Sequence, residues 1–126
     1  MNHEYLRRLI FENAQRDPHY HFTDLSQWDQ VLGLLTADEA ETIAFLKWDS
    51  CPETLFWIAP LLKEVSRAFQ SAAFIKFLRW YLEDLLEYPY CMENFLTPFM
   101  RSYVDERDFA ETVRKAIDEA EAVINN

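Results

Sequence analysis

The chain has 126 residues and a formal net charge of −10, from 12 Lys and Arg against 22 Asp and Glu. Half of the residues are hydrophobic and 16% are aromatic, which is too apolar for a disordered acidic tail and predicts a single folded domain. The acidity argues against a surface that binds nucleic acid or an anionic membrane, because both need basic patches. A basic partner is the natural complement.

Glycine, cysteine and the apolar runs narrow the class of protein further. Gly33 is the only glycine, which disfavours an all-β fold, because tight hairpins use glycine for positive-φ turns. Cys51 and Cys91 are too few and too far apart for a disulfide scaffold or a zinc site. The first ten residues lack the apolar core of a signal peptide, and no run is long enough to span a membrane. We therefore expect a soluble cytoplasmic protein.

The first third of the chain predicts a capping helix and a short hairpin. In residues 1–22, apolar positions at helical spacing are followed by Asp17-Pro18, which ends the helix ahead of a loop. Residues 24–48 predict the first hairpin, with one helix starting after Ser26. The capping box Thr36-Ala37-Asp38-Glu39 predicts that the chain turns and restarts there. In the second helix, Lys47 is expected on the face of Ala40, Ile43 and Ala44.

The remaining sequence predicts two similar units, residues 50–88 and 90–126. Pro60 and Pro98 lie 38 residues apart, and hydrophobic positions coincide when the chain is shifted by that offset. Each unit is predicted to hold a helix with an internal proline, a turn and a second amphipathic helix, with a kink or a restart at Pro60. The predicted fold class is all-α, with stacked antiparallel helical hairpins that resemble a HEAT-like α-solenoid or form an irregular helical bundle.

Residue types with catalytic or metal-binding potential do not form a recognisable constellation. His19 and His21 share a loop but have no second ligand cluster, so a solvated loop is the better interpretation. Cys51, at a predicted helix start, and Cys91 have no clear histidine partner, and their roles stay open. No phosphate-binding or nucleophile motif occurs. We predict no enzymatic activity, no catalytic residue, no metal and no cofactor.

Aromatic residues and carboxylates suggest a binding surface instead. The apolar stripes do not require all of the aromatic residues Trp48, Trp57, Trp80, Tyr81, Tyr88 and Tyr90. Core packing explains each of them singly, but together with an acidic rim they are typical of a protein-binding hot spot for a basic surface. The predicted contact surface consists of Trp48, Asp49, Trp80, Glu83, Asp84, Glu87, Tyr88 and Tyr90.

In size, acidity and helical-hairpin layout, the whole chain resembles the immunity proteins of bacterial toxin systems, including contact-dependent growth inhibition. The resemblance implies a stoichiometric inhibitor that binds a cognate toxin, expected to be a nuclease, and covers or distorts its active site. A nuclease must offer a basic cleft, for which an acidic protein can compete. The alternative is a helical adaptor or regulatory protein that binds a peptide or a helix in a repeat groove. An enzyme with carboxylates in an all-α core would need acidic residues on inward helix faces, and the stripes contain almost none.

Overall fold

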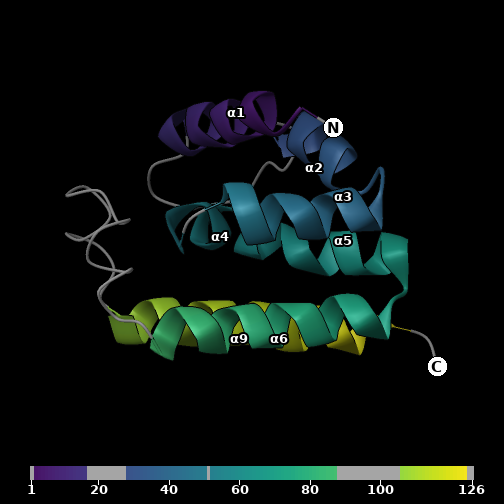
Figure 1. Cartoon of the computed structure of the whole chain (residues 1–126), viewed down its shortest axis with the longest axis vertical. Helices are drawn as coiled ribbons and strands as arrows, with labels where there is room; N and C mark the ends of the chain where they lie inside the picture. Colours follow the sequence, from purple (N-terminus) through teal and green to yellow (C-terminus); the bar gives the residue numbers. More distant parts are fainter. Residues whose placement is uncertain (1, 17–27, 51, 88–105, 125–126) are drawn as a thin grey trace.

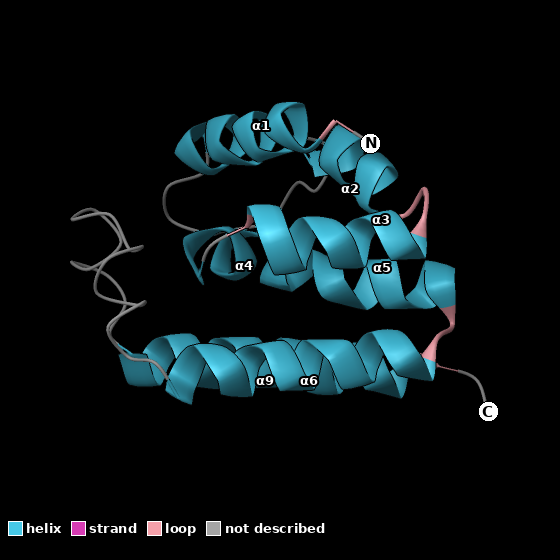
Figure 2. Ribbon diagram, viewed as in Figure 1, coloured by secondary structure: helices cyan, strands magenta, loops and turns pink. Residues whose placement is uncertain are grey.

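The computed structural model describes residues 2–16, 28–50, 52–87 and 106–124, and every regular element within these ranges is a helix (Figure 2). The helices lie in three layers (Figure 1). Helices α1 and α2 form the first, α3, α4 and α5 the second, and α6 and α9 the third. Their bounds are α1 His3–Arg16, α2 Asp29–Leu35, α3 Glu39–Ala44, α4 Pro52–Ile58, α5 Leu62–Phe69, α6 Ala72–Glu87 and α9 Glu106–Ala122. The all-α prediction is confirmed for the described residues.

Helix α1 covers one side of the core as the predicted N-terminal helix. Leu6, Ile10 and Ala14 recur every four residues and are fully buried, so one face of the helix lies against the second layer, where α1 contacts α4. The side chain of Asn2 caps its first turn by accepting a hydrogen bond of 3.0 Å from the Tyr5 amide. Capping satisfies one of the backbone donors that a helix start leaves unpaired.

The turn between α2 and α3 occurs where the sequence predicts it, but the capping residue is different. Asp38, not Thr36, is the N-cap of α3, and its carboxylate accepts from the Glu41 amide at 3.0 Å. Thr36 instead ends α2 and donates its hydroxyl proton to the Leu32 carbonyl at 2.8 Å. A hydroxyl that has already bonded the preceding helix cannot also cap the next one, so the cap moves to Asp38.

Helix α3 continues directly into a π-helical turn, η2 Phe45–Asp49, which the sequence did not predict. Phe45 and Leu46 are buried, whereas Lys47 and Trp48 are exposed. Ala40 and Lys47 are both exposed and Ile43 and Ala44 are half-buried, so the buried side of this segment is formed by Thr42, Phe45 and Leu46. The α-helix expected to continue to Lys47 ends at Ala44 and gives way to the π turn. Such π turns are rare and often occur at functional sites.

Pro60 divides the next helical segment as predicted. Helix α4 ends at Ile58, the 3-10 turn η3 covers Ala59–Leu61, and α5 restarts at Leu62. The break follows from the missing amide hydrogen of proline, which cannot complete a helical hydrogen bond. Helix α5 ends at Phe69, and the next residue, Gln70, caps it with a φ of 49°, in the left-handed region that terminates helices.

The third layer pairs α6 with α9 and fixes both against α5. Phe74 and Leu78 of α6 and Phe109 and Val113 of α9 are fully buried. The buried Ser66 hydroxyl of α5 donates to the Ala120 carbonyl at 2.6 Å. The apolar spacing of both helices predicted these faces.

Salt bridges between α6 and α9 neutralise two acidic residues near the C-terminal end of α9. Asp118 and Glu121 lie late in α9, where the helix dipole disfavours negative charge. Arg79 of α6 binds both carboxylates, at 3.0 Å and 3.2 Å. The hydrogen bond to Asp118 is the main cause that raises the pKa of the Arg79 guanidinium above its ordinary value.

The predicted repeat extends into a part of the chain that lies outside the described residues. Helices α4, α5 and α6 correspond to the unit 50–88, and α9 to the second helix of the unit 90–126. Pro98 and the apolar run around it, as well as Cys51, Cys91, His19 and His21, lie outside the described ranges. The HEAT-like layout therefore stays a prediction. None of the described helices combines the length and the apolar character needed to cross a membrane.

Candidate functional site

Two of the four tryptophans are exposed to solvent. The side chain of Trp48 in η2 is 73% exposed and that of Trp80 in α6 is 51% exposed, whereas Trp28 and Trp57 are 1% and 5% exposed. Tryptophan carries the largest apolar side-chain surface and is enriched where proteins bind each other tightly. Exposure on this scale, at two positions, marks a candidate site for a partner.

Lys47 brings these two tryptophans onto one surface. Its ammonium nitrogen lies 5.0 Å from the centre of the Trp48 ring and 5.8 Å from the centre of the Trp80 ring. Both distances are within the range of a cation–π interaction. We call Lys47, Trp48 and Trp80 the tryptophan surface. It joins η2 and α6, which the sequence separates by more than twenty residues.

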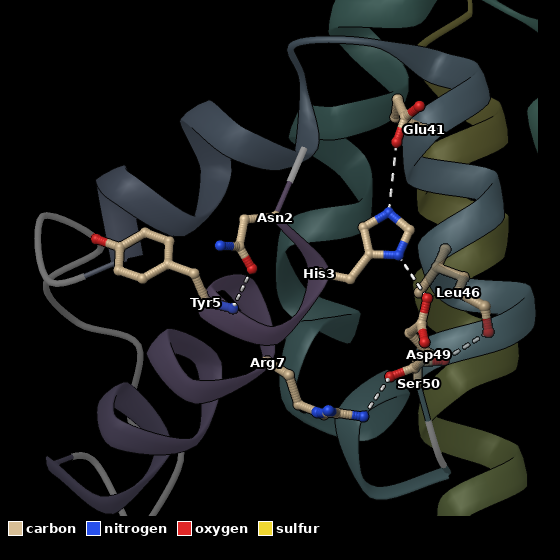
Figure 3. Close-up of polar contacts among 8 residues, drawn as sticks. All are labelled: Asn2, His3, Tyr5, Arg7, Glu41, Leu46, Asp49 and Ser50. Atoms are coloured by element: carbon tan, nitrogen blue, oxygen red, sulfur yellow. Dashed lines mark hydrogen bonds and ion pairs between the residues drawn. The ribbon is translucent and has the colours of Figure 1, made fainter.

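Two residues of α1, His3 and Arg7, contact the end of the π turn that carries Lys47 and Trp48 (Figure 3). The His3 imidazole lies between two carboxylates, with Nδ1 2.5 Å from Asp49 and Nε2 3.4 Å from Glu41. Arg7 donates to the Asp49 carbonyl at 3.4 Å. The Asp49 side chain and backbone are therefore both bonded to α1, which fixes the end of the turn next to Trp48.

Ser50 fixes the other side of the turn. Its hydroxyl donates to the Leu46 carbonyl at 2.6 Å and lies 2.8 Å from the Tyr81 hydroxyl of α6. A carbonyl in a π turn lacks the regular α-helical partner, so the serine hydroxyl supplies a replacement. Because Tyr81 is adjacent to Trp80, the same contact positions η2 relative to the tryptophan on α6.

The carboxylates of α6 differ in how far their charge is already neutralised. Trp80, Glu83, Asp84 and Glu87 follow helical spacing along one side of the helix. Glu83 pairs at 3.5 Å with Arg114 of α9. Within the described residues, Asp84 and Glu87 form no ion pair, and Glu87 is exposed at the end of the helix. Asp84 and Glu87 therefore provide the uncompensated negative charge beside the tryptophan surface.

The structure unites part of the predicted contact surface. It brings Trp48 and Trp80 together, places Glu83, Asp84 and Glu87 on the helix of Trp80, and directs the Asp49 carboxylate to His3. Tyr88 and Tyr90 lie outside the described residues. Trp57 and Tyr81, which the sequence analysis grouped with the surplus aromatic residues, are 5% and 7% exposed and belong to the core.

Sequence reasoning missed two contributors, Lys47 and His3. The Lys47-Trp48 dipeptide is the only local signal for the first, and it does not reveal the second tryptophan. His3 and Asp49 are 46 residues apart, so no spacing rule connects them. Within the described ranges, no group of His, Cys, Asp and Glu side chains could hold a metal ion.

A concave feature lies between α1 and α4. It has a volume of about 390 Å³, and its walls include Arg7, Arg8 and Phe11 of α1 and Thr54 and Trp57 of α4. The volume is within the range typical of small-molecule sites. Its charged rim contains Glu4 and Glu53 as well as the two arginines, so it favours neither sign of charge.

Comparisons with known proteins identify no relative for this arrangement. No protein-family model matches the sequence. No curated protein and no solved structure matches the chain. The assignment of function therefore depends on the geometry and charge of the chain itself.

Proposed function

We propose that the protein binds and neutralises a basic protein partner through the tryptophan surface and the adjacent carboxylates of α6. The sharper form of the proposal is an immunity protein that covers the active-site cleft of a nuclease toxin. The observation that carries it is the pair Trp48 and Trp80, 73% and 51% exposed on two elements and joined by Lys47. Leaving such apolar area in water has a cost that a bound partner would remove.

The two kinds of residue would contribute differently to binding. A buried tryptophan at the centre of an interface commonly contributes 2 kcal/mol or more, roughly, to the binding free energy. Carboxylates at the rim act mainly on the association rate, because they attract an oppositely charged partner before contact. With a net charge of −10, the chain favours fast encounter with a basic protein. The tryptophans would then determine how long the complex lasts.

Affinity capture from the native host, followed by an activity assay, tests the proposal. The wild-type chain should retain a basic protein with nuclease activity, and one equivalent of the chain should abolish that activity. The variant Trp48→Ala/Trp80→Ala should require roughly thirtyfold more protein for the same inhibition, because about 2 kcal/mol of binding free energy corresponds to that factor.

A matched control separates loss of the surface from general damage. Phe11→Ala/Tyr5→Ala removes two exposed aromatic side chains of α1 and should leave inhibition unchanged. Equal inhibition by the wild type and the tryptophan variant would contradict the proposal. A captured basic partner without nucleolytic activity would contradict the sharper form, the inhibitor of a nuclease toxin, and would leave a binding module for a basic protein.

The cleft between α1 and α4 favours a second candidate function, an adaptor that binds a peptide. Its volume of about 390 Å³ and the exposed Phe11 on its wall would suit one or two apolar side chains of an extended segment. The same variants distinguish the candidates. Loss of partner binding in Phe11→Ala/Tyr5→Ala but not in Trp48→Ala/Trp80→Ala would favour the adaptor.

A further inference from the structure

We infer that Trp48 and Trp80 form a cation-binding site that Lys47 occupies in the free protein, and that an arginine or lysine of the partner displaces Lys47 on binding. The inference rests on the proposed function, because it assumes a basic partner. It assigns the partner's chemistry at one point of the interface, a single cationic side chain between two indole rings.

The position of the Lys47 ammonium is the first argument. The chain holds 22 carboxylates for its 12 Lys and Arg, so an exposed lysine has many potential anionic neighbours. Within the described residues, however, Lys47 forms no salt bridge, and its ammonium nitrogen lies over the two indole rings. The site between the rings therefore accepts a cation even where carboxylates are abundant.

The framework around the site is the second argument. The π turn that carries Trp48 is held in place by the bonds of Asp49 to His3 and Arg7. Helix α6 fixes Trp80, whose ring also lies 6.0 Å from the Phe77 ring. A site whose walls are held independently of its occupant can exchange one cation for another, because little order is lost when the occupant leaves.

The occupant itself is weakly bound. An exposed cation–π contact changes an equilibrium constant by roughly two- to fivefold, and burial of the site by a partner strengthens the contact. A lysine ammonium is strongly hydrated on a flexible stem, whereas an arginine guanidinium is planar and stacks on aromatic faces. Once a partner covers the surface, its arginine should therefore bind between the rings more tightly than Lys47 does.

This arrangement would also discriminate between partners. A partner that offers a cation here restores the contact that Lys47 gives up. A partner that offers an apolar or acidic side chain leaves Lys47 buried among the rings or paired across the interface. Only a partner with a cationic side chain at this point replaces the cation–π contact of Lys47 with one of its own, and the site should therefore favour such a partner.

Indole nitrogen signals in ¹⁵N NMR spectra provide a direct test, because the four tryptophans give four signals. The probes are choline, a quaternary ammonium ion, and its uncharged counterpart 3,3-dimethyl-1-butanol. In Lys47→Ala, choline should shift the signals of Trp48 and Trp80 with a dissociation constant roughly two- to fivefold lower than in the wild type. The alcohol should shift neither signal. Assignment uses Trp48→Phe and Trp80→Phe.

Internal and matched controls accompany the titration. The buried Trp28 and Trp57 should not respond to choline, and their unchanged positions report that each variant is folded. Lys63→Ala removes another exposed lysine, on α5, and should behave as the wild type does. This control removes one positive charge, as Lys47→Ala does, but leaves Lys47 in contact with the two rings.

Two results would overturn the inference. One is an equal choline response in the wild type and in Lys47→Ala, and the other is an equal response to the uncharged alcohol. No partner is present in this experiment, so its failure is separate from failure of the proposed function. A choline response of the predicted kind would stand even if the captured partner proved not to be a nuclease.

Discussion

Trp28 and Trp48 begin and end the short segment that contains α2, α3 and η2, and their surroundings are opposite. Trp28 is 1% exposed in the core, and Trp48 is 73% exposed on the tryptophan surface. A core tryptophan removes its apolar area from water within the fold, whereas an exposed one leaves that area available to a partner. The same residue type therefore contributes to stability at one position and is available for binding at the other.

Substitution of these two residues should separate stability from binding. Trp28→Ala should lower the free energy of unfolding by about 3–5 kcal/mol, because it leaves a large cavity in the core. Trp48→Ala should change it by no more than about 0.5 kcal/mol. Urea denaturation followed by circular dichroism measures both. Comparable losses in the two variants would mean that Trp48 is packed in the fold.

At the scale of elements, the π turn η2 connects the fold to the surface. Its inner residues Phe45 and Leu46 are buried, and its outer residues are Lys47 and Trp48. Helix α1 holds the end of this turn through His3, whose ring also meets Phe45 edge to face at 5.5 Å. The first helix therefore helps to position the tryptophan surface without contributing a residue to it.

Removal of this contact should loosen the turn locally. His3→Ala should lower the free energy of local opening at the amides of Lys47, Trp48 and Asp49 by about 1 kcal/mol, since a partly exposed hydrogen bond and an aromatic contact are lost. Hydrogen exchange measured by NMR reports that change. The amides of α6 and α9 should exchange at unchanged rates, as should all amides in Glu12→Ala, an exposed site on the same helix. Unchanged exchange in the turn would refute the role of His3.

The elements that the sequence predicts well are those whose signal is local. The apolar spacing of α6 and α9 and the break at Pro60 depend on neighbouring residues within one or two turns. The π turn could not be predicted from local spacing, because the contacts that hold it include His3, which is 46 residues away from Asp49. The candidate site was predicted only in part, because burial of its aromatic residues also depends on contacts between distant parts of the chain. Trp48 and Trp57 both lie in predicted helices, and packing of α4 against α1 and α9 buries Trp57.

At the scale of the whole molecule, some of the carboxylates behind the net charge of −10 are paired with arginines, and others form no ion pair within the described residues. Asp118 and Glu121 are bound to Arg79, and Glu83 is paired with Arg114. Exposed pairs of this kind add little stability, about 0–1 kcal/mol each, but they neutralise charge along the contact between α6 and α9. Asp84 and Glu87 keep their charge beside the tryptophan surface. These two carboxylates add negative charge next to the exposed aromatic residues, where a basic partner could approach them.

The association rate with the captured partner, measured by stopped flow at increasing salt, tests this account most directly. Between roughly 50 and 200 mM salt, the rate should fall on the order of tenfold, because ions screen the attraction between opposite charges. Asp84→Asn/Glu87→Gln should slow association at low salt with little change in dissociation, and Glu12→Gln should alter neither. An association rate that depends neither on salt nor on Asp84 and Glu87 would contradict recognition of a basic partner at this surface.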